Sequence, residues 1–382
     1  MTKKRLLFFT NSLYGGGAEK VLQTLLCNLD STKYDITLYS VNEETLNERY
    51  PSNLKFRYIF KQNATNAISR LLAKITNKIK LLVYYNMSPE WFYRLFVRGK
   101  YDTEIAFIEG YSTRIISGST NKSSNKIAWV HIDLKNNHWT NIAYQNELEE
   151  EIAYHKYNSV ICVSENVKES MIKLFPKLET LQVKYNPIDD KAIKRLSTEN
   201  CTYYNDYNPD TIKLVSNGRL VHQKGYDRLL PIIKRIVDDG HNIHLTILGE
   251  GSDRRKLEEY ITINNLSEVV SLPGFVQNPY VIMANSDIFV CSSRAEGYST
   301  AVTEALILGL PIVTTNCSGM KELLGENNEY GIITENEDNA LFNGLKQLIS
   351  DENIFKMYKN KAIERGKHFS LEKLTQEIEK IL

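Results

Sequence analysis

The sequence lacks the patterns that mark several specialised classes of protein. No two of its five cysteines have the Cys-x-x-Cys spacing of a zinc or redox site, and their odd number argues against a disulfide framework. No apolar run approaches the length that a helix needs to cross a membrane. The basic start is followed by an apolar run over 6–9 that is too short for a signal peptide. These absences favour a protein of the cytoplasm with free, mostly buried cysteines.

An excess of charge of one sign is also missing. The 47 lysines and arginines nearly balance the 46 aspartates and glutamates, which leaves a formal net charge of +1. Such a chain is not drawn to nucleic acid as a whole, so we expect no nucleic-acid partner. The composition is that of an ordinary globular protein, and 382 residues are enough for two domains with separate cores.

The first half of the chain begins as a strand, a glycine-rich turn, a helix and a second strand. We expect these elements over 6–9, 14–17, 18–29 and 35–39. Further strands are expected at 103–108, 126–130 and 159–163. Strands that alternate with helices favour a parallel sheet, so residues 1–188 are expected to form one Rossmann-like domain.

The second half repeats this alternation after a polar segment over 189–210, which we expect to be a linker. The later strands are expected at 213–216, 243–249, 269–272, 288–291 and 311–315. They predict a second Rossmann-like domain over 211–364, followed by a helix over 365–382. This helix either stays with the second domain or packs on the first. The predicted fold class is therefore α/β, with two doubly wound domains. Each offers the carboxyl ends of its strands to ligands, and two such edges facing each other would form a cleft.

Two glutamates frame the segment that carries most of the chemistry. Glu296 follows the strand at 288–291, and Glu304 lies about two turns further, within an apolar helix. Ser299 and Thr300 place free backbone amides at the start of that helix, where a phosphate is readily bound. One carboxylate next to such a site can hold sugar hydroxyls and the other a ribose. The alternative is a capped helix with two solvated glutamates, and the segment by itself does not decide between them.

Seen together, several segments of the second half resemble a known family, the family-4 retaining glycosyltransferases of GT-B fold. The segments that carry the resemblance are 217–220, 223–227, 248–251, 273–275, 296–305, 309–311 and 319–322. Their order and number make the resemblance more specific than any one motif. It implies two Rossmann-like domains, of which the first, over 1–188, binds the acceptor and the second holds a nucleotide-sugar.

The resemblance gives site roles to named residues of this sequence. Those expected to be catalytic are Glu296, His131, Arg219 and Lys224. Those expected to bind the donor are Gly16, Gly17, Arg219, Lys224, Gly249, Glu250, Phe275, Val276, Gly297, Tyr298, Ser299, Thr300 and Glu304. No cofactor is expected, since the nucleotide-sugar is a substrate.

Arg219 and Lys224 also have a physical interpretation of their own. A nucleoside diphosphate departs with negative charge, and two cations can stabilise that charge where a metal ion would otherwise be needed. The sequence contains no Asp-x-Asp motif, which fits the metal-independent family that it resembles. The alternative is a pair of surface cations on a loop after a strand.

The first half contributes two weaker motifs. By resemblance, His131 is the histidine that contacts the transferred sugar, although a histidine after an apolar strand can also be purely structural. Gly16 and Gly17 resemble the family's turn beside the donor diphosphate, or else form a plain turn between a strand and a helix. A nicotinamide site is disfavoured, because Lys20 stands where a third glycine is needed.

The resemblance implies a retaining, metal-independent hexosyltransferase of cell-envelope polysaccharide synthesis. A hexose or N-acetylhexosamine would pass from a UDP-sugar, or alternatively a GDP-sugar, to a glycan or lipid-linked acceptor. The other interpretations are a catalytically weak GT-B partner of another transferase and a nucleotide-sugar epimerase.

The stretch over 68–98 leaves a second choice open. Apolar residues recur at helical spacing over 68–82, with lysines and arginines on other faces and aromatic residues after them. Such a stretch either packs its apolar face on the first domain's sheet or lies on an anionic membrane. The first is slightly favoured, and the second would make the protein peripheral on the inner face of the cell membrane.

Overall fold

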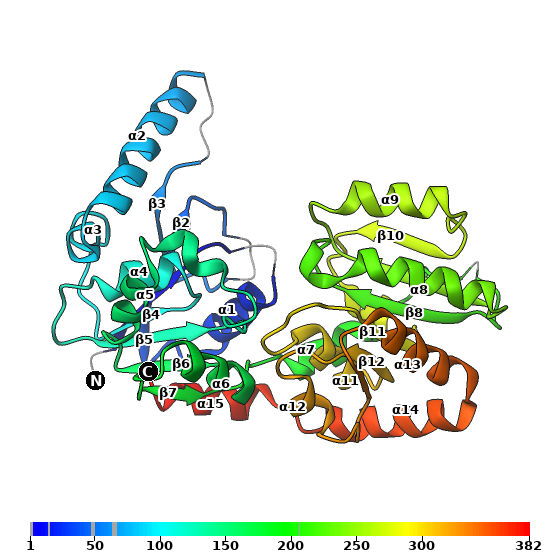
Figure 1. The fold of residues 1–382 in the computed structure, drawn as a ribbon. Coiled ribbons are helices and arrows are strands. Elements are labelled where there is room, and N and C mark those ends of the chain that lie inside the picture. The colour runs from blue at the N-terminus through cyan, green and yellow to red at the C-terminus, as the bar shows by residue number, and fades with distance from the viewer. Residues whose placement is uncertain (1–2, 14–15, 47–49, 63–66, 206) are drawn as a thin grey trace. The chain divides into compact units, whose positions relative to one another are not determined.

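The computed structural model describes residues 3–13, 16–46, 50–62, 67–205 and 207–382. The chain divides into two compact units, which Figure 1 colours along the sequence. Unit 1 comprises residues 1–187 and 372–382, and unit 2 comprises residues 188–371. Among the described residues, no helix is both long and apolar enough to cross a membrane.

Unit 1 is built on a sheet of parallel strands whose order is β3-β2-β1-β4-β5-β6-β7. The strands are β1 (Lys4–Thr10), β2 (Tyr34–Asn42), β3 (Lys55–Phe60), β4 (Thr103–Ala106), β5 (Asn125–Val130), β6 (Ser159–Cys162) and β7 (Leu181–Val183). The helices are α1 (Gly17–Asn28), α2 (Ala67–Asn86), α3 (Pro89–Phe96), α4 (Tyr111–Ser117), α5 (Glu147–Tyr154), α6 (Glu165–Leu174) and α15 (Leu371–Glu379), with a 3-10 turn η1 (Trp139–Ala143).

The centre of this sheet follows from the apolar pattern. Leu6 to Phe9 are fully buried on both faces of β1, as in a central parallel strand. Strand β1 pairs with β2 on one side and with β4 on the other. Helix α1 buries one apolar face, which consists of Val21, Leu22, Leu25 and Leu26.

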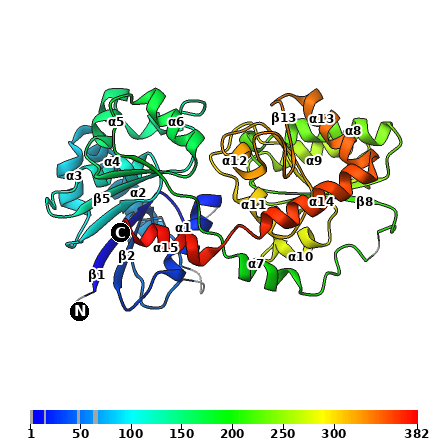
Figure 2. The same ribbon diagram turned by 90° about the horizontal axis from the view of Figure 1, so that it is seen from below.

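The end of the chain lies on unit 1, as both ribbon views show for α15 (Figures 1 and 2). The Thr103 hydroxyl donates a hydrogen bond to the Leu382 carbonyl at 2.5 Å, and the Asn125 side chain donates to the Ile381 carbonyl at 3.1 Å. Lys184 forms an ion pair with Glu377 at 3.3 Å. The last residues of the chain therefore contact the starts of β4 and β5 and the residue that follows β7, all of them far away in sequence.

A linker was expected over 189–210, but the described residues 189–205 and 207–210 belong to unit 2 and include a helix. Helix α7 (Asp190–Ser197) begins there, capped by the Asp189 side chain, which accepts a hydrogen bond from the Ala192 N–H at 2.8 Å. The Tyr204 hydroxyl lies 2.9 Å from the Ser286 hydroxyl, and the Tyr207 hydroxyl lies 3.1 Å from His244 Nε2. Tyr204 is buried here and Tyr207 is half-buried, so tyrosine rings provide buried surface in a segment that is poor in aliphatic residues.

Unit 2 repeats the architecture with the strand order β10-β9-β8-β11-β12-β13, again all parallel. The strands are β8 (Ile212–Asn217), β9 (Ile243–Leu248), β10 (Val270–Gly274), β11 (Ile288–Cys291), β12 (Ile312–Thr315) and β13 (Ile332–Thr334). The other helices are α8 (Tyr226–Asp238), α9 (Arg254–Ile263), α10 (Pro279–Ala284), α11 (Thr300–Ile307), α12 (Met320–Leu324), α13 (Asp338–Ser350) and α14 (Glu352–Gly366), with a 3-10 turn η2 (His222–Lys224).

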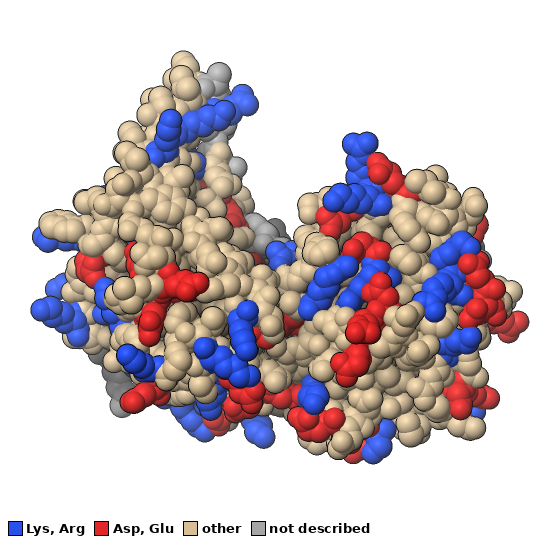
Figure 3. Space-filling view, viewed as in Figure 1, with Lys and Arg blue, Asp and Glu red and all other residues tan. Residues whose placement is uncertain are grey.

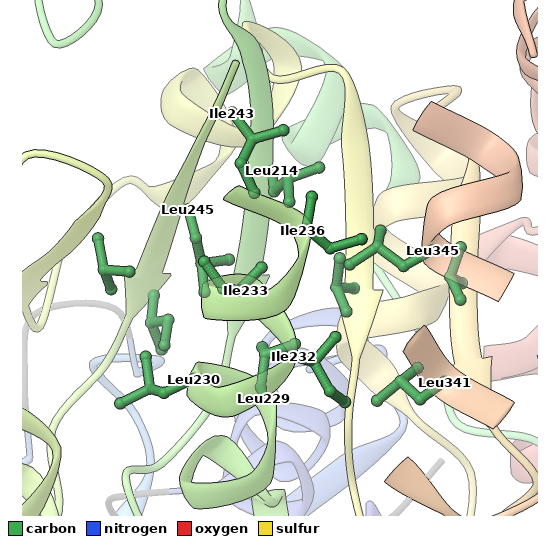
Figure 4. Packing of buried hydrophobic residues seen from close by; sticks show 14 of the residues in the cluster. Leu214, Leu229, Leu230, Ile232, Ile233, Ile236, Ile243, Leu245, Leu341 and Leu345 are labelled. Atoms are coloured by element: carbon green, nitrogen blue, oxygen red, sulfur yellow. The ribbon is translucent and has the colours of Figure 1, made fainter. Parts of the chain in front are cut away.

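The core of unit 2 lies between this sheet and the helices α8 and α13. Figure 4 shows isoleucines and leucines of α8, such as Ile233 and Ile236, meeting Leu214 and Leu245 of the strands and Leu345 of α13. Both units are thus doubly wound parallel sheets, and the predicted α/β fold class is confirmed. In each sheet the strand order reverses once, between β1 and β4 and between β8 and β11. Ligands of such sheets bind at the carboxyl ends of the strands at that reversal.

Candidate functional site

The reversal in unit 2 brings together a lysine, a glutamate and a serine. Lys224 Nζ lies 2.6 Å from Glu296 Oε1, and the Ser293 hydroxyl donates to the same oxygen at 2.6 Å. Lys224 follows β8 and the other two follow β11, so the contact joins the two strands that flank the reversal. The structure therefore unites two residues that the sequence placed 72 positions apart.

This ion pair is largely withdrawn from solvent. The exposed fraction is 19% for the Lys224 side chain and 9% for that of Glu296. Burial by itself lowers the pKa of Lys224, but the Glu296 carboxylate beside it outweighs burial and raises that pKa to about 12. Lys224 is therefore a full cation at neutral pH. A charge in such a sheltered place acts on a neighbouring anion more strongly than one in bulk water.

A tight turn holds Lys224 in place. Gly225 has φ +68°, and a Cβ at this position would lie 2.1 Å from the Ser292 carbonyl oxygen. The Ser292 hydroxyl donates to the Lys224 carbonyl at 2.9 Å. A glycine is thus required for the loop after β8 to reach the end of β11.

Sequence reasoning missed Arg228, which fixes the end of β11. This buried guanidinium donates from Nη2 to the carbonyls of Ser292 at 2.7 Å and Ser293 at 2.9 Å. Its position in α8 was the available signal, because Arg228 falls on the same helical face as the buried Ile232 and Ile236. An arginine on an apolar face indicates a buried partner.

The glutamates that frame 296–304 are both buried, with exposed fractions for the whole residue of 8% for Glu296 and 2% for Glu304. The alternative of two solvated glutamates is therefore wrong. Glu296 lies before α11, whereas Glu304 lies within it and is reached by the Tyr280 hydroxyl at 3.5 Å. Ser299 caps the helix by accepting from the Val302 N–H at 3.4 Å.

The segment between the glutamates lies close to the start of α12. The residues expected there to bind the donor are Gly297, Tyr298, Ser299 and Thr300. Gly319 has φ +77°, and a Cβ at that position would lie 2.5 Å from the Gly297 carbonyl oxygen. This close approach joins the segment after β11 to the loop that precedes α12.

The loops after β8, β9 and β10 carry the other predicted donor residues. Gly249 has φ +139°, and a Cβ there would lie 2.1 Å from the Gly218 carbonyl oxygen, so the loops after β8 and β9 touch through their backbones. Glu250 is exposed and pairs with Arg254 at 2.8 Å. The remaining predicted residues of these loops are Arg219, which is exposed, Phe275, which is 78% exposed, and Val276, which is half-buried.

In unit 1 the corresponding strand ends hold His131. Its Nε2 lies 2.8 Å from the Phe107 carbonyl oxygen, which can only accept, so Nε2 carries the proton and Nδ1 keeps a lone pair. Burial lowers the pKa of His131 to about 4, so the ring is neutral at physiological pH. Nδ1 can accordingly accept a hydrogen bond from a sugar hydroxyl. The neighbouring Asp133 accepts from the Lys135 and Asn136 N–H groups and so caps the next turn.

Glu109 is a second residue that sequence reasoning missed. This carboxyl group is 3% exposed and accepts hydrogen bonds from the His131 backbone N–H at 3.0 Å and from Trp139 Nε1–H at 3.3 Å. Burial raises its pKa to about 7. An acidic residue directly after an apolar strand and before Gly110 was the signal in the sequence. Glu109 positions the backbone of His131.

The glycine-rich turn of unit 1 is described only in part. Gly16 caps α1 in an extended conformation without a side-chain hydrogen bond, and Gly17 begins that helix. A Cβ at Gly16 would lie 2.5 Å from a carboxylate oxygen of Glu19. Residues 14–15 of the turn lie outside the described residues. The predicted site residues thus form two groups, one at the strand ends of each unit.

The sequence is similar to known proteins of one family. The sequence model of the family "Glycosyl transferases group 1" matches residues 205–368, which cover most of unit 2. A Campylobacter jejuni N-acetylgalactosamine-N,N'-diacetylbacillosaminyl-diphospho-undecaprenol 4-alpha-N-acetylgalactosaminyltransferase is 29% identical, over 99% of both chains. A capsular polysaccharide biosynthesis glycosyltransferase of Staphylococcus aureus, CapM, is 26% identical over 54% of this chain and 56% of its own.

Solved structures share the whole fold. The crystal structure of Anabaena Alr3699/HepE in complex with UDP has a TM-score of 0.73 at 17% identity and covers 98% of both chains. A sucrose-phosphate synthase from Thermosynechococcus elongatus has a TM-score of 0.76 at 13% identity, over 99% of this chain and 98% of its own. At these identities the likeness concerns the fold.

Proposed function

The chain is a glycosyltransferase of group 1, and from this premise we propose that it is a retaining, metal-independent hexosyltransferase that moves a sugar from a UDP-sugar to a lipid-linked acceptor. The observation that carries the proposal is the sheltered contact of Lys224 with Glu296 at the strand reversal of unit 2. A cation there stabilises the diphosphate as it departs, and Glu296 keeps that cation oriented.

Metal independence is proposed because protein cations can neutralise the leaving group. Lys224 supplies one sheltered positive charge, and the exposed guanidinium of Arg219 follows the same strand. The N-terminus of α11 adds backbone N–H groups that favour a phosphate. Together these groups can do what a divalent cation does in other transferases.

The donor assignment rests on the loops around this cluster. The exposed ring of Phe275 is available to stack on a nucleobase, and the buried carboxylate of Glu304 is suited to accept hydrogen bonds from a ribose. UDP is bound by the HepE structure that shares the fold, which supports a uridine donor. A GDP-sugar remains the second candidate.

Retention follows in the proposed mechanism from a reaction on one face of the sugar. The bond between the anomeric carbon and the phosphate oxygen breaks, and the acceptor oxygen bonds to that carbon from the same side. The acceptor's proton passes to the departing phosphate oxygen. The neutral Nδ1 of His131 would hold a sugar hydroxyl, so the chain contributes orientation and charge stabilisation.

The acceptor is proposed to be a lipid-linked saccharide of the cell envelope, with the protein working at the inner membrane surface. The full-length similarity to a transferase whose name specifies a diphospho-undecaprenol acceptor supports this class. Glycan acceptors without lipid are the alternative.

The test is a thermal-shift panel with UDP, GDP, ADP, TDP and their sugars, with and without EDTA. A ligand that binds only the folded state raises the unfolding temperature, so we expect a shift with UDP and UDP-sugars that EDTA does not reduce. Loss of the shift with EDTA would contradict metal independence. Binding without transfer to any acceptor would favour the partner-protein interpretation, and epimerised free donor would favour an epimerase.

A further inference from the structure

Helix α2 of unit 1 carries an apolar stripe that is largely exposed to solvent. The stripe consists of Ile68, Leu71, Leu72, Ile75, Ile79 and Leu82. Their exposed fractions lie between 49% and 74%. Their spacing is that of one helical face, which in most globular proteins turns towards the core. The packing of this face on the sheet, which the sequence slightly favoured, is therefore wrong.

Polar side chains hold α2 in this unusual orientation. The Asn77 side chain donates to the Lys61 carbonyl at 2.6 Å and accepts from the Lys61 N–H at 3.1 Å. Lys80 donates to the Ile59 carbonyl at 2.5 Å, and the buried Tyr84 donates to the Ala143 carbonyl at 2.7 Å. Asn77, Lys80 and Tyr84 share the helical face opposite to the stripe. Unit 1 thus fixes α2 with the apolar stripe outward.

The charge of α2 differs from that of the chain as a whole. The helix contains Arg70, Lys74, Lys78 and Lys80 and no acidic residue, whereas the chain is nearly neutral. Arg70, Lys74 and Lys78 are spaced by four, are exposed, and line one flank of the stripe. Figure 3 shows basic side chains near the upper end of the α2 segment of unit 1, with mixed charge on the rest of the visible face.

The following helix, α3, also carries exposed apolar side chains beside a basic one. Trp91 and Leu95 of α3 are 54% and 51% exposed, and the Arg94 guanidinium lies 5.4 Å from the Trp91 ring. Tryptophan beside a basic residue is favoured at the level of lipid headgroups. Protein interfaces, by contrast, are depleted in lysine, so a membrane surface fits α2 better than a second protein does.

We propose that α2 lies in the headgroup layer of an anionic membrane, with its apolar stripe in the acyl boundary and its basic flank on lipid phosphates. A helix with this apolar stripe and charge lies along the bilayer surface, since it is not apolar enough to cross. The inference specifies the surface by which the proposed enzyme would meet a lipid-linked acceptor. It does not depend on which nucleotide-sugar the protein uses.

The test is sedimentation of the full chain with vesicles of phosphatidylcholine, with or without phosphatidylglycerol. We expect binding to the anionic vesicles only. The triple substitution Leu71→Asn, Ile75→Asn and Ile79→Asn should weaken it at least about 10-fold. Arg70→Gln, Lys74→Gln and Lys78→Gln together should weaken it about 100-fold at low salt.

Matched controls come from exposed residues elsewhere. Ile263→Asn with Met357→Asn removes apolar surface from unit 2, and Lys256→Gln removes a charge there; neither should change binding. Each α2 variant should keep its thermal shift with UDP, so failure of the donor proposal and failure of docking are distinguished. The inference would be overturned if the wild-type protein did not sediment with anionic vesicles. It would also be overturned by a wild-type dimer that the apolar variant turns into a monomer.

Discussion

Buried charged and polar residues decide most of what happens at the scale of single residues. Lys224 and Glu296 each depend on the other, because a buried charge without its partner is costly. Glu109 is instead buried and His131 half-buried, each without an opposite charge beside it, and their pKa values move in the directions that favour the neutral forms. The first pair is suited to bind an anion and the second to orient hydroxyl groups.

Lys224→Gln tests the charged pair. It should lower kcat/KM about 100- to 1,000-fold, because one cation on the leaving group is lost while the loop stays intact. The measurement is sugar transfer from UDP-sugar to a lipid-linked acceptor, with circular dichroism to check the fold. Lys256→Gln, at an exposed lysine of the same unit, is the matched control and should leave the rate unchanged.

Glu109 and His131 should give the stability of unit 1 two opposite pH dependences. The pKa of Glu109 is about 7 when folded against 4.5 ordinarily, so its contribution to the free energy of unfolding falls as pH rises from 4.5 to 7. The pKa of His131 is about 4 when folded against 6.5 ordinarily, so its contribution rises with pH from 4 to 6.5.

Substitution separates these two slopes. In Glu109→Gln the free energy of unfolding should rise steadily with pH up to the ordinary pKa of histidine, whereas in His131→Asn it should fall between pH 4.5 and 7. Urea unfolding followed by tryptophan fluorescence measures this, because Trp91, Trp129 and Trp139 all lie in unit 1. Identical pH profiles for both variants and the wild type would refute the assignment.

At the scale of elements, the conformation of short turns determines the positions of the site residues. The loop after β8 meets the end of β11 only because Gly225 has a positive φ and no side chain. In helix α2, the hydrogen bonds of a few polar side chains, among them Asn77 and Tyr84, determine which face of the helix is turned outward.

Gly225→Ala tests the turn. A Cβ would lie 2.1 Å from the Ser292 carbonyl oxygen, so the strain of a positive φ is joined by a backbone clash, and we expect a loss of at least about 3 kcal/mol with weak donor binding. Gly240→Ala is the control, since Gly240 has φ +88° but nothing within 4 Å of its Cβ. That variant should lose only about 1 kcal/mol. Equal losses would mean that the clash is relieved by movement of the loop.

At the scale of the whole molecule, each unit has its own sheet and core, and the chain passes between the units twice. The first passage is at Pro187–Ile188, and the second is at the start of α15, after which residues 372–382 belong to unit 1. Ile378 and Leu382 are buried there. The stability of unit 1 thus depends on the end of the chain.

Deletion of residues 372–382 should therefore destabilise unit 1 and spare unit 2. It exposes the apolar surface under Ile378 and removes the acceptors of Thr103 and Asn125. The tryptophan-monitored unfolding midpoint, which reports on unit 1, should fall clearly, while calorimetry should still detect UDP binding at unit 2. A midpoint equal to that of the full chain would show that these contacts add nothing to stability.

Much of the architecture was predictable from the local pattern. Fully apolar runs such as 6–9 mark central parallel strands, and the ordered segments over 217–322 carry the resemblance to the glycosyltransferase family. Each of these features is contained in a short stretch of sequence, so it can be recognised without knowledge of distant contacts. The prediction of a linker over 189–210 failed because it, too, used only local sequence. The tyrosines of this stretch bind partners that are distant in sequence and meet them only in the folded unit.

What the sequence by itself determined is therefore the α/β class, the two repeated sheets and the segments that carry the resemblance to the glycosyltransferase family. Only the tertiary structure decided that Lys224 and Glu296 share a sheltered contact, that Arg228 and Glu109 support the strand ends, and that the apolar stripe of α2 faces outward. The physical reason is common to all of these. Burial, pairing and the orientation of a face depend on which distant residues the folded chain brings near, and periodicity along the chain does not contain that information.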